Sequence, residues 1–322
     1  MSALTVAELV TRKSETLQLE VLTEGAGLER LITVPEVSSP GLVLAGYIDR
    51  FMSERLHVLG QTEVNYLKSL KPAARRQSLE GLMCDEVPCV FVTKSQSVPD
   101  EVVAVADERG VPVIRSALST SEFYRRLTPY LTEAFAPSST LHGSLADVYG
   151  VGLLFVGRSG IGKSECVLDL VERGHRLVAD DVVHVTRRGT DVIIGRAPDL
   201  THGYMEIRGI GIVDVSALFG IRAVRQQKRI EVVVQLADWD SASNIDRTGL
   251  ENQTTEILAV EMPTVIVPLN PGKNITVVSE IVAMNHLLRY SGVNSARDLD
   301  DKLISQMAEQ RRLREYLSED YE

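Results

Sequence analysis

The sequence predicts a two-domain α/β protein, and three observations lead to that prediction. The chain has 322 residues, a length that favours two domains. Short apolar runs typical of strands alternate with mixed apolar and polar runs typical of helices. Residues 136–140 (APSST) are small, polar and proline-bearing, as in a linker or turn. We therefore expect an N-terminal domain over residues 1–134 and a C-terminal domain over residues 135–322.

The sequence pattern of the N-terminal half predicts strands that alternate with helices. We predict strands at residues 54–59, 88–93 and 111–114, and helices at residues 61–70, 72–82 and 99–109. Gly110 follows the last of these helices and is typical of a helix C-terminus. Alternation of this kind favours a mainly parallel sheet. This half of the sequence carries no phosphate loop, metal-ligand cluster or nucleophile signature.

The C-terminal half has an apolar run at residues 151–156 that leads into a glycine-rich loop. A helix is predicted over residues 163–173, and Gly174 suits the position that ends it. From about residue 280 the sequence is helical, with a break at residues 292–295. Further strands are predicted at residues 176–179, 182–186, 192–195, 230–236 and 264–267.

Composition narrows the classes of function. The net charge of −10 argues against non-specific nucleic-acid binding, which depends on Lys and Arg. The three cysteines, Cys84, Cys89 and Cys166, are odd in number and lack zinc-ligand spacing, so we expect small buried side chains in a reducing compartment. Residues 1–17 do not resemble a signal peptide, and no apolar run is long enough to cross a bilayer. We therefore expect a cytoplasmic protein without a membrane or nucleic-acid partner.

The glycine-rich loop is the strongest functional signal. The glycines allow positive φ, so that successive N–H groups can turn inward around phosphate. Lys163 would contact the β- and γ-phosphates of a nucleotide, and the Ser164 hydroxyl would contact Mg²⁺. The alternative is a turn between strand and helix that binds no ligand. The loop matches the Walker A pattern through Gly157, Arg158, Ser159, Gly160, Ile161, Gly162, Lys163 and Ser164.

An acidic pair, Asp180 and Asp181, directly follows an apolar strand. Two carboxylates at a strand end can reach a metal ion or a substrate hydroxyl, in the manner of a Walker B acid. One of them could accept the proton of an attacking hydroxyl and return it in the reverse direction. The alternative is a simple turn, which Asp favours.

Three further places carry weaker signals. In residues 205–212, Glu206 and Arg208 would share a face of an extended chain, and Gly209 and Gly211 allow a close backbone approach to a ligand. The alternative there is a surface salt bridge beside a bulged strand. Two single residues, His142 and Arg247, could equally be a structural histidine and a solvated arginine.

Together these residues resemble the bacterial HPr kinase/phosphorylase family. The resemblance implies a bifunctional enzyme that uses ATP to phosphorylate a serine of HPr, the phosphocarrier of the sugar phosphotransferase system, in carbon catabolite control. It also implies removal of that phosphate by inorganic phosphate, with release of pyrophosphate. The motifs that carry it are residues 141–143 (LHG), 157–165, 173–181 (RGHRLVADD), 205–215, 239–240 (WD) with 246–247 (DR), and 271–274.

The same resemblance implies the architecture. Members of the family are hexamers of two-domain subunits. The N-terminal domain would resemble a Mur-ligase domain, and the C-terminal P-loop kinase domain would be related to phosphoenolpyruvate carboxykinase. In the kinase domain Lys163 would hold the phosphates, while Ser164 and Glu206 would bind Mg²⁺.

Catalytic roles also follow from the resemblance. Asp181 would act as the base of the kinase reaction and the acid of its reverse, with Asp180 beside it. His142 and Arg247 stand at positions that are catalytic in the family. Arg247 would neutralise charge that develops on the transferred phosphoryl group.

One loop departs from the family pattern Pro-Val-Arg-Pro-Gly-Arg. Pro268 and Gly272 are kept, but Asn270 removes a cation and Lys273 replaces a forked guanidinium by a point charge. That loop is associated in the family with dephosphorylation, so the departure bears on phosphorolysis rather than on the kinase reaction. Two other functions stay open. The chain could phosphorylate a small metabolite, or it could be a nucleotide-gated sensor without catalysis.

Overall fold

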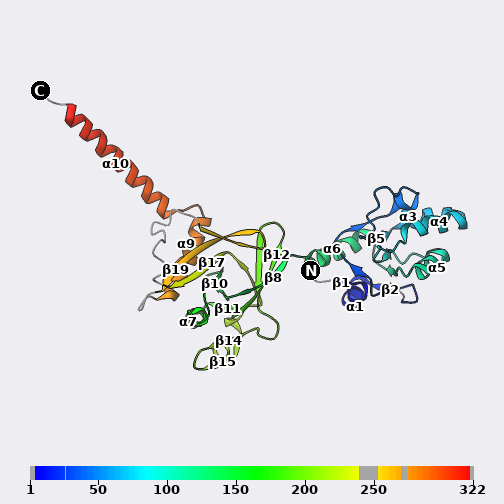
Figure 1. The fold of residues 1–322 in the computed structure, drawn as a ribbon, viewed down its shortest axis with the longest axis horizontal. Helices are drawn as coiled ribbons and strands as arrows, with labels where there is room; N and C mark the ends of the chain where they lie inside the picture. The colour runs from blue at the N-terminus through cyan, green and yellow to red at the C-terminus, as the bar shows by residue number, and fades with distance from the viewer. Residues whose placement is uncertain (1–3, 26, 239–252, 270–273, 320–322) are drawn as a thin grey trace. The chain divides into compact units, whose positions relative to one another are not determined.

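The computed structural model of the chain describes residues 4–25, 27–238, 253–269 and 274–319. Two compact units are present, Met1–Ala136 and Pro137–Glu322 (Figure 1). Each unit combines helices and strands around its own apolar core. The prediction of a two-domain α/β protein is therefore confirmed.

The N-terminal unit is built on a five-stranded sheet in the order β2-β7-β6-β5-β4. The last four strands of that order run parallel and only β2 is antiparallel, so the prediction of a mainly parallel sheet is confirmed. The central strands are buried, as expected for parallel strands that helices cover. The strands are β2 (Leu19–Val21), β4 (Val37–Ser38), β5 (Leu56–Leu59), β6 (Val90–Val92) and β7 (Val113–Ser116), and a separate pair is formed by β1 (Leu4–Thr5) and β3 (Leu31–Ile32).

The helices of this unit include the three that the sequence predicts. The helix that precedes Gly110 ends at that glycine, whose φ is 60°. The first, second and last helices were not predicted. The last contains Pro129, which lowers the helical signal because proline lacks an N–H and clashes with the preceding turn. The helices are α1 (Val6–Leu17), α2 (Gly41–Leu44), α3 (Gln61–Ser69), α4 (Pro72–Leu82), α5 (Asp100–Arg109) and α6 (Thr120–Ala134).

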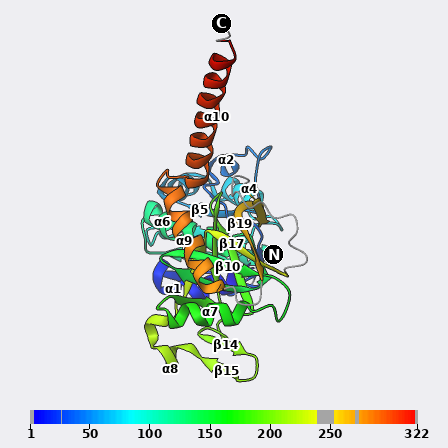
Figure 2. The ribbon, with the colours of Figure 1, turned by 90° about the vertical axis from the view of Figure 1, so that its left-hand side faces the viewer.

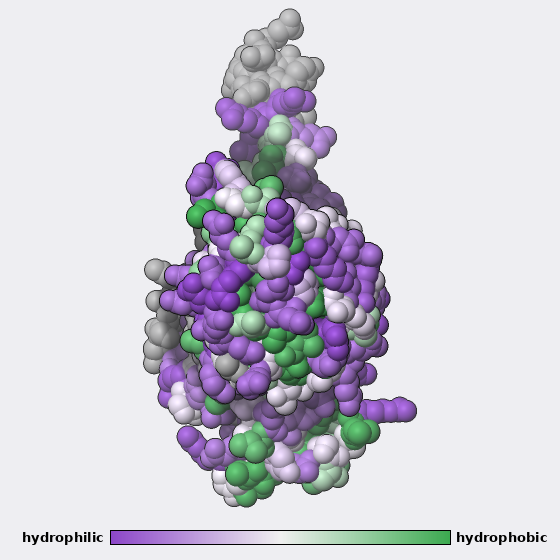
Figure 3. Space-filling view, turned by 90° about the vertical axis from the view of Figure 1, so that its right-hand side faces the viewer, coloured by the Kyte–Doolittle hydropathy of each residue, from purple (hydrophilic) through white to green (hydrophobic). Residues whose placement is uncertain are grey.

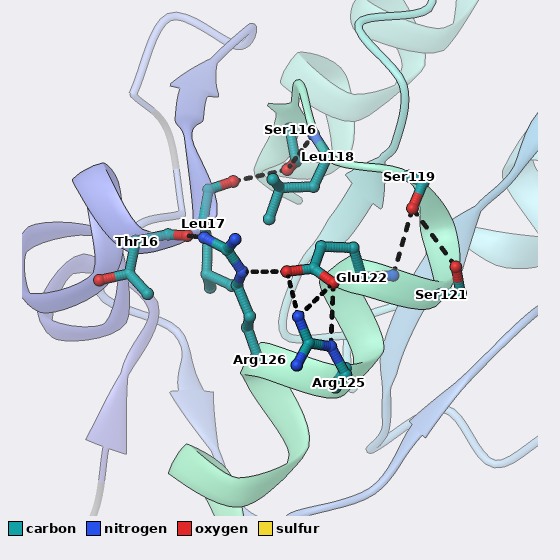
Figure 4. A network of polar contacts seen from close by, with 9 residues as sticks. All are labelled: Thr16, Leu17, Ser116, Leu118, Ser119, Ser121, Glu122, Arg125 and Arg126. Carbon is teal, nitrogen blue, oxygen red and sulfur yellow. Dashed lines mark hydrogen bonds and ion pairs between the residues drawn. The ribbon is translucent and has the colours of Figure 1, made fainter.

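Polar contacts join the C-terminal end of α1 to β7 and to the start of α6 (Figure 4). The buried Ser116 Oγ donates to the Leu17 carbonyl at 2.5 Å, and Arg126 Nη1 donates to the Thr16 carbonyl at 2.8 Å. Arg126 is in turn held by Glu122, whose Oε1 lies 2.6 Å from Arg126 Nε. The last carbonyls of a helix lack intrahelical partners, so these donors satisfy the end of α1 and fix its place.

The C-terminal unit contains two larger sheets (Figure 1). One has six strands in the order β11-β9-β10-β17-β19-β18, in which β10, β17 and β19 run parallel, and the other is antiparallel in the order β16-β13-β12-β8. Apolar residues of both sheets form one core. The strands are β8 (Ser138–His142), β9 (Ser144–Val148), β10 (Val151–Val156), β11 (Arg176–Ala179), β12 (Val182–Arg188), β13 (Val192–Arg196), β16 (Gln227–Ile230), β17 (Val232–Asp238), β18 (Gln253–Ile257) and β19 (Val260–Leu269).

Two helices pack on the six-stranded sheet, α7 (Lys163–Glu172) and α9 (Ile275–Tyr290), and they share a second apolar core with it. In Figure 2 α9 lies in front of β10 and β17, with α7 below it. The predicted break at residues 292–295 separates α9 from α10 (Ser295–Glu319). Of the helices in the described part of the chain, none combines the length and the apolar character needed to cross a bilayer.

Two predictions of local structure are wrong in part. The expected linker at residues 136–140 runs into strand β8, whose polar residues are exposed because β8 lies at the edge of its sheet. The single strand expected at residues 230–236 is two strands. The chain leaves β16 at Ile230, where it pairs with Ile193, and enters β17 at Val232, where it pairs with β10 in the other sheet.

Candidate active site

The glycine-rich loop lies at the C-terminal end of β10, a strand with neighbours on both sides, and α7 begins within it. Gly157, Gly160 and Gly162 have φ of 148°, 72° and 107°, which side-chain-bearing residues rarely adopt. At residue 157 a Cβ would also approach the Leu236 carbonyl oxygen to 2.7 Å. The strand, loop and helix that a Walker A sequence requires are therefore present, with the positive end of a helix dipole at the loop.

The Lys163 side chain folds back against this loop and is only 6% exposed. Its Nζ donates to the carbonyl oxygens of Gly157 and Arg158, at 3.0 Å each. A buried ammonium group needs such partners, but an anionic phosphate oxygen binds it more strongly than a neutral carbonyl does. The loop therefore positions the ammonium group where it would meet a bound phosphate chain.

Asp180 is a buried carboxylate between β11 and β12, 6% exposed. Its Oδ1 accepts hydrogen bonds from Ser144 Oγ at 2.6 Å and from Ser164 Oγ at 2.9 Å. Burial raises the pKa of the Asp180 carboxyl above its ordinary value, and the two hydroxyl donors act against that rise. The other oxygen, Oδ2, is buried without a hydrogen-bond partner. A buried oxygen of this kind beside a Walker A serine suits a cation or an ordered water.

Asp181, the next residue, has a left-handed backbone, with φ 62°. This conformation is uncommon for a residue with a side chain, and the Gly143 N–H stabilises it by donating to the Asp181 carbonyl at 3.0 Å. The Asp181 side chain is 63% exposed, and its Oδ1 lies 3.3 Å from Nδ1 of His142. Two adjacent aspartates thus have different environments, one buried against hydroxyls and one exposed beside an imidazole.

The pairing of β8 with β12 brings His142 to this place. His142 is the last residue of β8 and pairs directly with Val182, the residue after Asp181. Gly143 then turns the chain toward β9, and a Cβ at that position would lie 2.5 Å from the Phe155 carbonyl oxygen. The close approach explains the glycine that follows the histidine.

Residues 205–212 form a hairpin rather than one extended strand. It consists of β14 (Tyr204–Ile207) and β15 (Gly211–Asp214), so Arg208 lies in the turn and does not continue the face of Glu206. Gly209 and Gly211 have φ of 86° and 99°, which the tight turn requires. Arg208 packs over the phosphate loop, since a Cβ on Gly160 would lie 2.7 Å from Arg208 Nη2.

These groups surround one cavity of about 130 Å³. It combines the cations Lys163 and Arg208 with four acidic side chains and the Ser164 hydroxyl, a donor set that fits a phosphate chain and a hard divalent cation. The cavity is lined by His142, Ser159, Gly160, Gly162, Lys163, Ser164, Glu165, Asp180, Asp181, Glu206 and Arg208.

Other predicted site residues lie apart or are not described. The Arg158 side chain forms a two-point ion pair with Asp238, at 2.7 and 2.8 Å, so only its backbone belongs to the loop. Ile161 is buried in the core, and Pro268 lies near the end of β19, paired with Ala237. Arg247, Asn270, Gly272 and Lys273 lie outside the described residues.

Sequence reasoning missed Ser144, which is fully buried and gives Asp180 its shorter hydrogen bond. No local pattern marks it, because it is one of two polar residues, with Asp147, in a short buried strand. Its position directly after His142 and Gly143 was the only available signal.

Comparison with family models assigns both halves of the chain. Residues 4–131 match the model described as "HPr Serine kinase N terminus", and residues 133–303 match "HPr Serine kinase C-terminal domain".

Curated relatives match over nearly the full length. An HPr kinase/phosphorylase of Chloroherpeton thalassium is 43% identical over 313 residues, which cover 95% of this chain and 92% of the relative. An HPr kinase/phosphorylase of Bacillus mycoides is 42% identical over 291 residues, 90% of this chain and 94% of the relative. Among solved structures, the Hpr(Ser) kinase/phosphatase from Coxiella burnetii is 34% identical, with a TM-score of 0.45, over 50% of this chain and 98% of that one.

Proposed function

Because this chain belongs to the HPr kinase/phosphorylase family, we propose that it phosphorylates a serine of HPr with ATP and removes that phosphate by phosphorolysis. The observation that carries the proposal is the convergence of Lys163, Ser164, Asp180 and Asp181 on one cavity at the end of β10. Such a cavity has the parts that phosphoryl transfer needs: cations for the phosphates, a carboxylate beside a hydroxyl for a metal ion, and an exposed acid.

ATP would bind with its β- and γ-phosphates in the loop of residues 157–164. The backbone N–H groups at the start of α7 would donate to the phosphate oxygens, and Lys163 Nζ would exchange its two carbonyl partners for them. Arg208, which packs against Gly160, would also contact the γ-phosphoryl group. Both cations would stabilise charge that accumulates during transfer.

Ser164, Asp180 and Glu206 would hold Mg²⁺. The unpartnered Oδ2 of Asp180, the Ser164 hydroxyl 2.9 Å from its Oδ1, and the Glu206 carboxylate at the cavity are oxygen donors of the kind this ion prefers. When bound, Mg²⁺ would neutralise phosphate charge. Of the two aspartates, Asp180 would bind the metal ion, because it is buried against Ser164.

Asp181 would then act as the base. Its exposed carboxylate would accept the proton of the HPr serine as the serine oxygen attacks the γ-phosphorus and the bond to ADP breaks. In the reverse reaction, inorganic phosphate attacks the phosphoserine phosphorus, the bond to the serine oxygen breaks, and protonated Asp181 returns the proton to that oxygen. His142 would orient the Asp181 carboxylate through its Nδ1.

The kinase proposal is tested by incubating the purified protein with ATP, Mg²⁺ and HPr. Phosphate on an HPr serine, detected by mass spectrometry, is the expected result. A labelled metabolite with unmodified HPr would instead identify a small-molecule kinase, and ATP binding without turnover would identify a sensor.

Phosphorolysis needs its own assay because residues 270 and 273 depart from the family pattern. Phospho-HPr and inorganic phosphate should yield pyrophosphate. If the reaction is absent, Asn270→Arg with Lys273→Arg should restore it.

Assembly and location are also proposed from the family. We expect a homohexamer, which light scattering after size-exclusion chromatography would measure. We expect a cytoplasmic location, since all three cysteines are free thiols. Fractionation of bacterial cells would test this.

A further inference from the structure

Large apolar side chains are exposed around the β14–β15 hairpin, on α8 (Val215–Phe219), and on the following short helix η1 (Ile221–Ala223). Figure 3 displays hydrophobic residues at the lower end of the C-terminal unit, where β15 and α8 lie in Figure 2. Contiguous apolar surface of this kind usually marks a place where a partner binds. We define the hairpin patch as Tyr204, Ile210, Ile212, Leu218, Phe219 and Ile221, which are 44, 74, 77, 64, 41 and 86% exposed.

The hairpin patch is continuous with the catalytic cavity. In the antiparallel register Ile212 pairs directly with Glu206, so both side chains project from one face of the hairpin, with Cβ atoms about 5 Å apart. Glu206 lines the cavity, whereas Ile212 is exposed beside it. Ile210 stands in the turn, two residues after Arg208, which also lines the cavity.

The opposite face of the hairpin fixes it to the protein. Met205 and Ile207 alternate with Tyr204 and Glu206 and are buried in the core that includes α7. The exposed apolar residues are therefore not a consequence of a loose loop, because their strand neighbours are anchored. A fixed apolar surface costs little conformational entropy when a partner binds to it.

The cavity itself is too small to hold a protein. Its volume of about 130 Å³ admits phosphate groups and a serine hydroxyl, so a folded substrate must be held by surface outside it. The hairpin is well suited, because it reaches from the cavity wall at Glu206 to the exposed Ile212.

We propose that the hairpin patch is the docking surface for the protein substrate, which would contact it through an apolar surface next to the phosphorylated serine. This inference rests on the proposed function and adds the place and chemistry of substrate recognition. Since the same protein must dock in both directions, the patch would serve phosphorylation and phosphorolysis alike.

The test compares Leu218→Asp and Ile221→Asp with the wild-type protein, because neither residue lines the cavity. Each variant should raise the KM for HPr at least tenfold, which corresponds to about 1.4 kcal/mol, because a charge would be buried at the interface. The dissociation constant for ATP and the circular dichroism spectrum should stay unchanged. Leu42→Asp is the matched control, since Leu42 is 70% exposed on α2, and it should keep the wild-type KM.

A wild-type KM for HPr in both patch variants would overturn the docking surface and leave the kinase function intact. Failure of the wild-type protein to phosphorylate HPr would overturn the function and, with it, this partner. A second measurement places a photoreactive benzoylphenylalanine at Leu218. Crosslinking to HPr supports the proposal, whereas crosslinking only to another copy of this chain overturns it.

Discussion

Gly160→Ala tests the phosphate loop through two separate effects. The backbone at Gly160 has φ 72°, where an alanine is strained by about 1–2 kcal/mol. The added Cβ would also lie 2.7 Å from Arg208 Nη2, so the guanidinium must move away from the loop. The first effect lowers stability, and the second changes the contact that Arg208 makes with phosphate.

Both effects have expected magnitudes. For a unit of this size, 1–2 kcal/mol lowers Tm by about 2–8 °C. A charge-assisted hydrogen bond contributes about 1.5–3 kcal/mol, so loss of the Arg208 contact should lower kcat/KM for ATP about 10- to 150-fold. Steady-state kinetics and thermal melts measure the two quantities independently.

Gly189→Ala separates the loss of stability from the loss of the Arg208 contact. Gly189 has a similar φ of 65°, but nothing lies within 4 Å of its added Cβ, and it lies outside the cavity. This control should lose Tm as Gly160→Ala does and keep its kcat/KM. Equal kcat/KM in the two variants would refute the role given to Arg208 at the loop.

Three further predictions concern the acids. Asp181→Asn should lower kcat about 10²- to 10⁴-fold with ATP affinity retained in calorimetry, because it removes a general base; a normal rate would contradict that role. Ser144→Ala removes a hydroxyl that donates to Asp180 at 2.6 Å, so the pKa of Asp180 should rise further. The acid limb of the pH profile of kcat/KM should therefore move to higher pH. The control Ser116→Ala, in the N-terminal unit, should leave that acid limb in place. Glu280→Gln should destabilise the protein at pH 7 in urea unfolding by about 1.5–3 kcal/mol, since Glu280 pairs with Arg173 at 2.7 Å and His175 at 3.1 Å. Arg173 holds the pKa of Glu280 below its usual range. The stabilisation by Glu280 is therefore present above the unfolded pKa of about 4.3 and should fade as pH falls through the folded pKa. A difference in stability that does not change with pH would argue against the ion pair.

Features that depend on a contiguous stretch of residues were readable from the sequence. The loop of residues 157–164 needs glycines, a lysine and a serine at set spacing between one strand and one helix, and all of these are local. The helices α3, α4 and α5 were likewise predicted, because apolar periodicity and the glycine after α5 act within a few residues. The order of these elements was sufficient to predict a mainly parallel sheet in the N-terminal unit.

Features that depend on pairing between distant strands were decided only by the tertiary structure. The pairing of β8 with β12 sets His142 beside Asp181, whose backbone is left-handed. Ser144 reaches Asp180 across 36 positions of sequence. The sequence by itself thus determined that a phosphate loop and an acidic pair are present, and the folded chain decided which acid is buried beside Ser164 and which is exposed. The physical reason is that periodicity reports a residue's neighbours along the chain, whereas burial, and with it the pKa of a carboxyl, depends on strands that meet only after folding.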